Sequence, residues 1–323
     1  MNVLVTGGAG YIGSVTSEQL IESGHKVIVI DNLIKGHKDA VHPDAVFYHG
    51  DINNEPLVGD ILRKHQIDAV MHFAADALVG ESMQDPDKYF SNNVVNGFKL
   101  VQTAAKNKVK KFIFSSTCAT YGEPEQIPIP ETHLQKPCNP YGESKLILEK
   151  IIRWYAEIFG FEYVFLRYFN ACGASDRYGE DHDPETHIIP IVLQAAIGQR
   201  KQVMVMGDDY PTPDGTCIRD YIHVLDLAAA HILALEHKGS GFFNLGNMTG
   251  FSVMEVIKIA EKITGRKIKF TMAPRRPGDP AQLVGSSEKI RKELGWNPRF
   301  TSLEQMIESA WKWKLKHPEG YKK

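Results

Sequence analysis

The chain has 323 residues, of which 43% are hydrophobic and 24% charged, and its formal net charge at pH 7 is −2. Such a length suits a globular protein of two domains. The near-neutral charge gives no sign of nucleic acid or an anionic membrane as a partner. No apolar run approaches the ~20 residues that span a bilayer, and the N-terminus shows no signal-peptide pattern, so we expect a cytoplasmic protein.

The four cysteines and 13 histidines bear on redox state and metal binding. Cys118, Cys138, Cys172 and Cys217 lie far apart and match neither a zinc motif nor a disulfide framework, so we expect them to be reduced. The histidines form no His-Glu-x-x-His motif or similar cluster. We therefore predict solvated or core histidines and no metal site.

The first element is an apolar run at residues 3–5, followed by a glycine-rich turn and a helical pattern. Gly7 permits the tight turn, Gly10 lets the backbone approach a pyrophosphate, and Gly13 lets the helix pack closely on the strand. The free N–H groups at the helix N-terminus then face the phosphate charge. A flexible turn is the alternative interpretation.

A second strand is expected at residues 26–30 and ends in Asp31. The sequence therefore has a strand before the turn, a helix after it and an acidic residue at the end of the next strand, which favours a dinucleotide site. A carboxylate at this position accepts both hydroxyls of the adenosine ribose and repels a 2′-phosphate. The pattern thus predicts NAD rather than NADP.

The remainder of the first half alternates strands with helices. Further strands are expected at residues 45–48, 68–73, 111–116 and 163–169, and helices at 57–65, 87–107 and 139–159. This alternation predicts an α/β fold with a doubly wound parallel Rossmann sheet and right-handed crossovers. Its ligand sites are expected at the carboxyl ends of the strands.

The pattern changes after Asn170. Residues 173–186 are polar and predict a loop or junction. Helices are expected at 188–197, 221–236, 252–264 and 303–316, and a strand at 242–246. We predict an NAD-binding domain over residues 1–175 and a smaller C-terminal substrate domain over 176–323, with the segment near 220–247 packing back on the first domain.

The most informative stretch begins one of these helices. Asn139 suits its cap and Pro140 its first position, so Tyr141 and Lys145 lie one turn apart on one face. Oxidising an alcohol with NAD requires a base, and a phenol with the usual pKa of about 10 is a poor one. A nearby ammonium and a positive nicotinamide would lower that pKa. An amphipathic helix with an unremarkable tyrosine and lysine is the alternative.

Hydroxyl side chains end the strand at 111–116. Ser115, Ser116 and Thr117 stand at the sheet edge where the site is expected. A hydroxyl there can hydrogen-bond the substrate oxygen and share its proton with Tyr141. The alternative is a strand-end cluster that bonds its own backbone.

Together, the glycine-rich turn, the Tyr141-x-x-x-Lys145 spacing and the strand-end Ser116/Thr117 resemble the extended short-chain dehydrogenases/reductases. Longer stretches over nearly the whole chain are similar to the UDP-glucose 4-epimerases of that family. These stretches are residues 31–33, 50–52, 79–82, 166–170, 209–212, 219–223 and 273–279.

The resemblance implies an NAD-dependent isomerase that interconverts UDP-galactose and UDP-glucose through a 4-keto intermediate, with UDP-N-acetylhexosamines as possible further substrates. It also implies a homodimer formed by helices near 92–106 and 141–159. A pentose or uronate epimerase and a non-catalytic NAD-sensing regulator are the alternatives. A 4,6-dehydratase is disfavoured, because Cys118 and Ala119 stand where that enzyme carries Asp-Glu.

The resemblance also implies roles for individual residues. Tyr141 is the expected base, Lys145 its electrostatic partner and Thr117 the hydroxyl that orients the substrate. The residues expected to bind NAD are Gly7, Gly10, Tyr11, Ile12, Gly13, Asp31, Asn32, Asp51, Ile52, Phe73, Asn92, Tyr141, Lys145 and Tyr168. The residues expected to bind the UDP-sugar are Thr117, Asn170, His187, Arg219, Arg276, Asp279 and Leu283.

Four positions depart from the family pattern. Ala77 stands where many members carry a lysine near the nicotinamide ribose, and His187 stands where an asparagine often contacts the nucleotide sugar. Thr117 replaces the usual serine, and Leu283 replaces a tyrosine that narrows the sugar pocket in some members. We therefore expect one lost cofactor contact and a wider sugar pocket.

Overall fold

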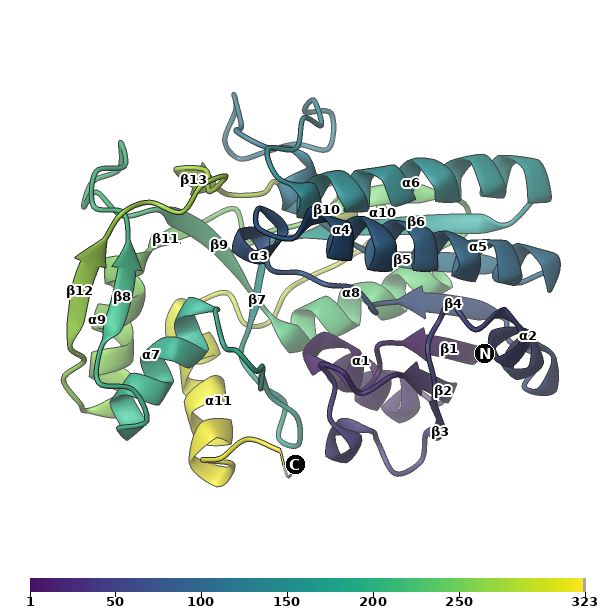
Figure 1. Ribbon diagram of the computed structural model, residues 1–323, viewed down its shortest axis with the longest axis horizontal. Coiled ribbons are helices and arrows are strands. Elements are labelled where there is room, and N and C mark those ends of the chain that lie inside the picture. Colours follow the sequence, from purple (N-terminus) through teal and green to yellow (C-terminus); the bar gives the residue numbers. More distant parts are fainter. Residues whose placement is uncertain (322–323) are drawn as a thin grey trace.

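The computed structural model describes residues 1–321 and has two lobes, a larger one on the right of Figure 1 and a smaller one on the left. The larger lobe is built on a seven-stranded sheet. Its strands are β1 (Asn2–Thr6), β2 (Lys26–Asp31), β3 (Val46–His49), β4 (Ala69–His72), β5 (Lys111–Thr117), β6 (Glu162–Tyr168) and β10 (Gly241–Leu245). They run parallel in the order β10-β6-β5-β4-β1-β2-β3, which confirms the doubly wound sheet.

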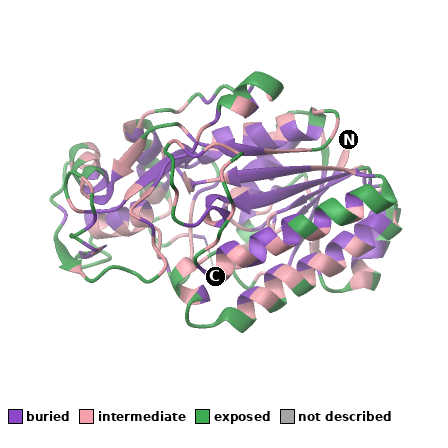
Figure 2. Cartoon of the chain, turned by 90° about the horizontal axis from the view of Figure 1, so that it is seen from above, coloured by how far each residue is buried: buried purple, intermediate pink, exposed green. Residues whose placement is uncertain are grey.

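Helices cover both faces of this sheet. One layer contains α2 (Glu55–Lys64), α5 (Gly97–Lys106) and α6 (Pro140–Phe159), and the other contains α1 (Tyr11–Glu22), α8 (Val224–Glu236) and α10 (Glu288–Leu294). Successive strand residues point to opposite faces, so Leu4 packs in the first core whereas Val3 and Val5 pack in the second. The strands are therefore buried on both sides, as Figure 2 shows in purple.

The smaller lobe has its own core between short strands and three helices. Its strands are β7 (Asn170–Cys172), β8 (Val203–Met206), β9 (Ile218–His223), β11 (Gly250–Ser252), β12 (Phe270–Ala273) and β13 (Gln282–Leu283). Its helices are α7 (Ile188–Ile197), α9 (Val253–Thr264) and α11 (Leu303–Lys316). Strand β9 is central, because it pairs with β7, β11 and β13.

Two expected helices are wrong in part. Residues 221–223 lie in β9, and α8 begins at Val224, where the His223 ring accepts the Leu225 N–H. The helix expected at 87–107 is three consecutive segments: α4 (Pro86–Tyr89), the π-helix η2 (Phe90–Asn96) and α5. The strands that sequence analysis missed have two to six residues, and pairing with distant segments stabilises them more than any local pattern.

The second half of the chain also contributes to the larger lobe. Strand β10 pairs with β6, and α8 packs against α1. The division of the chain at residue 175 stays a prediction. Over residues 1–321, none of the helices has the length and apolarity needed to cross a membrane.

Candidate active site

The glycine-rich turn joins β1 to α1. Gly7 has φ 72°, and a Cβ there would lie 2.6 Å from the Ala74 nitrogen. A Cβ on Gly13 would lie 2.2 Å from the Gly7 oxygen, so this glycine permits the close approach of helix and turn. Gly10 is less crowded and precedes α1 with no side-chain cap, which leaves the first helical N–H groups for an anion.

Asp31, at the end of β2, stabilises the glycine-rich turn through hydrogen bonds. Its carboxylate accepts the Ala9 N–H at 3.0 Å and the Leu33 N–H at 2.8 Å. Burial raises the pKa of this carboxyl, and the two backbone hydrogen bonds oppose the shift. The neighbouring Asn32 side chain donates to Asp51 at 3.0 Å. The structure therefore gives Asp31 a bracing role that the sequence did not reveal, beside its predicted ribose contact.

We expect Asp31→Ala to lower the preference for NAD over NADP by about tenfold, because removing one like charge relieves its repulsion of a 2′-phosphate. The ratio of the two dissociation constants, measured by calorimetry, separates this effect from a general loss of affinity. Asp31→Asn is the matched variant, since it removes the charge but retains one oxygen that can accept one of the two backbone N–H groups. Equal affinity of the wild type for both dinucleotides would contradict the prediction.

Thr117, Tyr141 and Lys145 come together at the carboxyl end of β5. Helix α6 begins there because the Asn139 side chain accepts the Gly142 N–H at 2.8 Å and Pro140 follows the cap. Burial raises the pKa of Tyr141 to about 12, although its hydrogen bond with Thr117 lowers it in part. The predicted lowering of this phenol pKa requires the positive nicotinamide beside Lys145, so it stays a prediction.

Lys145 lies beneath this site. Its Nζ donates to the Ser115 carbonyl at 3.1 Å and lies 4.9 Å from the centre of the Phe114 ring. Burial lowers its pKa to about 7. At neutral pH, Lys145 is therefore partly protonated. A negative charge that forms on a neighbouring phenol would favour the protonated form of this lysine.

The three hydroxyl side chains at the end of β5 do not all lie on the same face of the strand. Ser115 hydrogen-bonds the Tyr168 hydroxyl, whereas Ser116 donates to Glu149 at 2.5 Å on the other face. Thr117 also accepts the Ala119 N–H at 3.1 Å, so it bonds the local backbone as well. Strand alternation therefore leaves Ser115 and Thr117 on the face with Tyr141 and Tyr168.

Two of the residues expected at the nicotinamide end are Phe73, in the loop after β4, and Asn92, in η2. Asn92 donates to Asp76 at 2.8 Å, and the Lys88 Nζ lies 3.3 Å from the same carboxylate. Phe73 packs against His231 with ring centres 4.7 Å apart. Lys88, which sequence analysis missed, thus places a cation beside Asp76, the residue that precedes Ala77. It lies in α4 and had no motif of its own.

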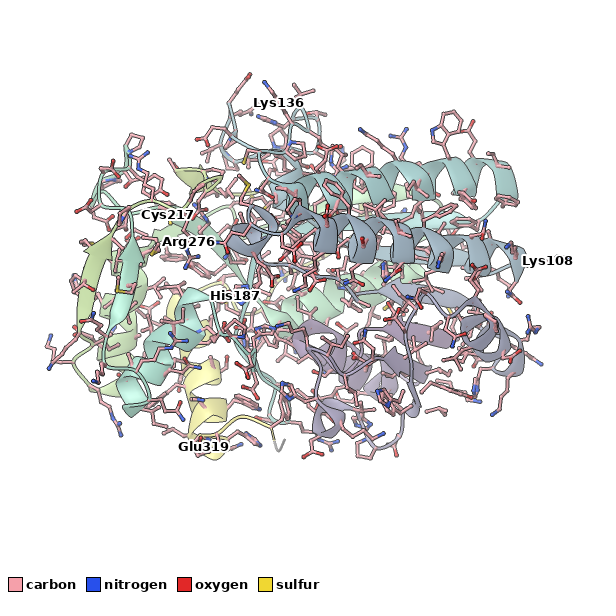
Figure 3. The ribbon with its side chains drawn as sticks, in the orientation of Figure 1. Lys108, Lys136, His187, Cys217, Arg276 and Glu319 are labelled. Carbon is pink, nitrogen blue, oxygen red and sulfur yellow. The ribbon has the colours of Figure 1, made fainter. Side chains whose placement is uncertain are left out.

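The substrate residues gather around β9 and β13. Arg219 is buried in β9 and forms an ion pair with Asp279. Leu283 pairs with Arg219 in register and packs in one cluster with Cys118 and Phe169. This cluster connects the substrate lobe to the residue next to Thr117. Asn170 begins β7 beside it, and Arg276, labelled in Figure 3, is exposed in the loop after β12.

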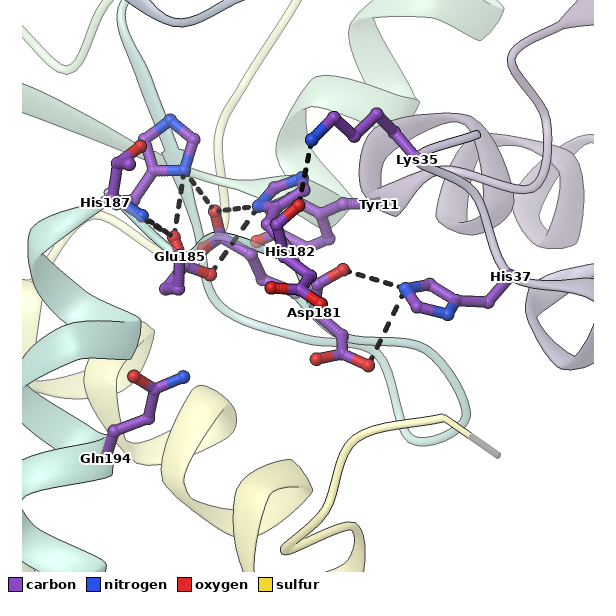
Figure 4. Close-up of polar contacts among 12 residues, drawn as sticks. Tyr11, Lys35, His37, Asp181, His182, Glu185, His187 and Gln194 are labelled. Carbon is purple, nitrogen blue, oxygen red and sulfur yellow. Dashed lines mark hydrogen bonds and ion pairs between the residues drawn. The ribbon is translucent and has the colours of Figure 1, made fainter. Parts of the chain in front are cut away.

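His187 stands just before α7 and faces acidic groups. Its Nδ1 lies 2.7 Å from Glu180 and 3.5 Å from Glu185, and His182 lies beside the same two carboxylates (Figure 4). The expectation that the histidines form no cluster is therefore wrong. The sequence signal for this cluster is the spacing Glu-x-His-x-x-Glu-x-His, which lies within the stretch predicted as a polar loop.

Comparisons with known proteins agree with this geometry. The profile of the NAD dependent epimerase/dehydratase family matches residues 3–246. A UDP-glucose 4-epimerase of Halalkalibacterium halodurans is 56% identical over 327 residues, which cover 99% of this chain and 98% of that protein.

Two solved structures cover nearly all of both chains. UDP-glucose 4-epimerase from Bifidobacterium longum, in complex with NAD+ and UDP, is 39% identical with a TM-score of 0.96, covering 99% of this chain and 100% of its own. The UDP-Glc/GlcNAc 4-epimerase of Campylobacter jejuni is 41% identical with a TM-score of 0.84, covering 98% and 99%. With the family profile matching most of its length and these similarities extending from end to end, the chain belongs to the NAD dependent epimerase/dehydratase family and, within it, to the UDP-glucose 4-epimerases.

Proposed function

We propose that this protein interconverts UDP-galactose and UDP-glucose through a 4-keto intermediate, using tightly bound NAD. The observation that carries the proposal is the placement of Thr117, Tyr141 and Lys145 at the carboxyl end of β5, where an open α/β sheet holds its ligands. When bound, NAD supplies a hydride acceptor and, once reduced, a hydride donor.

The chain's own groups handle the proton. Tyr141 takes the proton of the sugar 4-hydroxyl, and the Thr117 hydroxyl orients the same oxygen. Lys145 stabilises the resulting charge, since its buried ammonium interacts strongly with a nearby anion. Reversing these steps after the sugar has turned gives the other epimer. The reaction therefore has no net redox change and needs no external acceptor.

The nucleotide end holds the substrate while the sugar turns. Arg219 is already paired with Asp279, so its guanidinium is oriented before a diphosphate arrives. A planar guanidinium suits phosphate oxygens in a bidentate contact. Arg276 is exposed and supplies a second cation. Asp279 then accepts from the uridine ribose, and holding mainly at this end leaves the hexose free to rotate.

Product analysis tests the proposal. The purified protein is incubated with UDP-galactose, and in parallel with UDP-pentoses and UDP-uronates. We expect UDP-glucose to accumulate without net NADH absorbance. Steady release of NADH would indicate a dehydrogenase instead. Preferred turnover of a pentose or uronate would assign the chain to another epimerase, and bound NAD without any turnover would favour a regulator.

We also propose that N-acetylated UDP-hexosamines are substrates, because Leu283 leaves more room than a tyrosine. We expect Leu283→Tyr to lower kcat/KM for UDP-N-acetylgalactosamine by about tenfold or more, while largely sparing UDP-galactose. Steady-state kinetics with both sugars measures the effect. Leu283→Met keeps the volume and is the control. If Tyr slows both substrates alike, its contacts with Cys118 and Phe169 have been disturbed and Leu283 is not the gate.

Finally, we propose a cytoplasmic homodimer. The four cysteines are free, as expected in a reducing compartment. The expected dimer interface lies on η2, α5 and α6, and apolar side chains are exposed there on η2 and α6. These side chains are Val95, Trp154, Ile158 and Phe159. A contact between two such surfaces would remove them from water. Sedimentation velocity measures the assembly, and a monomer at micromolar concentration would contradict it.

A further inference from the structure

A histidine–carboxylate cluster lies in the segment between β7 and α7, outside the catalytic group. Glu180, His182, Glu185 and His187 each contribute one potential ligand atom, and these four atoms lie within 4.8 Å of one another. Figure 4 shows the two imidazole rings and the carboxylates converging from one short stretch of chain. The cluster is therefore formed by local spacing, with the N-terminus of α7 holding its last member.

The geometry of the ring nitrogens differs from that of simple ion pairs. Nδ1 of His182 and Nδ1 of His187 are both buried, and neither makes a hydrogen bond of acceptable geometry within residues 1–321. Carboxylate oxygens nevertheless lie 2.7–3.6 Å from them. Two buried nitrogens that face the same oxygens without aligned N–H groups are placed as ligands of a shared ion would be.

Glu185 is the fixed member of the cluster. Its side chain is only 2% exposed, and one carboxylate oxygen accepts the N–H groups of Thr186 at 2.7 Å and His187 at 2.8 Å. The other oxygen lies 3.6 Å from Nδ1 of His182. Ligating carboxylates are held by hydrogen bonds of this kind, because these bonds set the orientation of the oxygen that binds the ion.

Charge balance also allows an ion. The cluster brings two carboxylates and two imidazoles together. A divalent cation balances the charge of the two carboxylates, and neutral imidazole nitrogens supply its other two ligands.

We propose that these four residues bind one Zn²⁺ ion. Two imidazole nitrogens and two carboxylate oxygens form a four-ligand set that suits zinc. In a tetrahedral site with ligands about 2.1 Å from the ion, the ligand atoms lie ~3.4 Å apart, so the four atoms, now within 4.8 Å of one another, close by up to roughly 1.4 Å when zinc binds. Nε2 of His187 is not a ligand in this arrangement and stays available to the predicted substrate contact.

The ion has a structural role beside the dinucleotide turn. Several contacts join the cluster-bearing segment to the larger lobe. Among them, Tyr11 donates to the Gly173 carbonyl at 2.6 Å, Lys35 donates to the Asp183 carbonyl at 2.8 Å, and His37 contacts the Asp181 carbonyl at 3.0 Å. The Tyr11 ring also meets His182 edge-on, with ring centres 6.4 Å apart. Zinc would therefore hold the segment that joins the NAD-binding turn to the substrate lobe.

Zinc titration of the full-length protein tests this proposal. Protein stripped with a chelator and returned to chelator-free buffer is titrated with ZnCl₂ by calorimetry, and bound zinc is measured after gel filtration. We expect one zinc per chain and a rise of several degrees in the apparent Tm. His182→Ala and Glu185→Gln should each weaken zinc binding by more than ~100-fold. His37→Ala is the matched control, because it touches the same segment but is not a ligand.

Cobalt substitution gives a readout that needs no variant. Co²⁺ bound to the wild type should show the intense visible absorption of a four-coordinate site. Wild-type protein that binds less than stoichiometric zinc, or ligand variants that bind it as the wild type does, would overturn the proposal and leave only histidine–carboxylate ion pairs. A variant that fails to fold leaves the wild-type stoichiometry and the cobalt spectrum as the deciding measurements.

Discussion

Tyr141→Phe should lower kcat for UDP-galactose by about 10²–10⁴-fold, the range that positioned proton transfer contributes. The substitution removes only the hydroxyl. The remaining ring retains its edge-on contact with Tyr89, whose centre lies 6.3 Å away. We therefore expect the affinities for NAD and for UDP-galactose to stay near those of the wild type. Steady-state kinetics measures the loss, and calorimetry measures the two affinities.

Because Tyr141 is buried, deprotonation of its hydroxyl depends on nearby positive charge. With a pKa raised to about 12, its hydroxyl is protonated at neutral pH. The positive charges of Lys145 and of an oxidised nicotinamide are what would lower it. Lys145→Met should accordingly shift the rise of the pH–rate profile to higher pH. If Tyr141→Phe keeps the wild-type kcat and Lys145→Met keeps the wild-type pH–rate profile, Tyr141 is not the base.

A matched control lies on the same helix. Tyr155 is in α6 but packs against Phe98 and Phe159, away from the end of β5. Tyr155→Phe removes the same atom from the same element and should leave kcat within about twofold of the wild type, as expected for a group that transfers no proton. A comparable loss of kcat in both variants would mean that helix packing, rather than proton transfer, explains the effect.

Glu149→Gln should lower the free energy of unfolding by about 3–5 kcal/mol, because it leaves a buried guanidinium without its counter-charge. Glu149 and Arg167 are 2% and 4% exposed, and Arg167 donates to both carboxylate oxygens at 2.9 and 2.6 Å. Ser116 shares the same carboxylate at 2.5 Å. The pair therefore fixes α6 to β5 and β6 directly under the catalytic end of the sheet.

Denaturant unfolding of the variant and the wild type measures this loss. The control is the double substitution Glu149→Leu/Arg167→Met, which removes both charges and should cost less than Glu149→Gln alone. Tyr121, whose hydroxyl accepts from Arg167 at 3.0 Å, still donates to Asn244 in that variant. A Glu149→Gln protein as stable as the wild type would show that Arg167 is neutralised by another route.

Local spacing alone determined the parallel sheet and the core of the candidate site. The turn from Gly7 to Gly13, the acid at Asp31 and the Tyr141–Lys145 pair are each set by neighbours in sequence. The backbone conformation of these residues, and the face of the strand or helix on which each side chain lies, follow from the periodicity of the sequence. For this reason the sheet and the positions of these residues at its edge are predictable from the sequence alone.

Only the tertiary structure decided which distant groups share an environment. Arg219 contacts Asp279, Glu149 contacts Arg167, and β9 includes the first three residues of a segment expected to be helical, all through partners far away in sequence. Burial, which is a property of the whole fold, raises the pKa of Tyr141 in the protein without NAD. Packing and desolvation sum over neighbours that no local pattern contains, so these contacts and charges emerge only when the chain has folded.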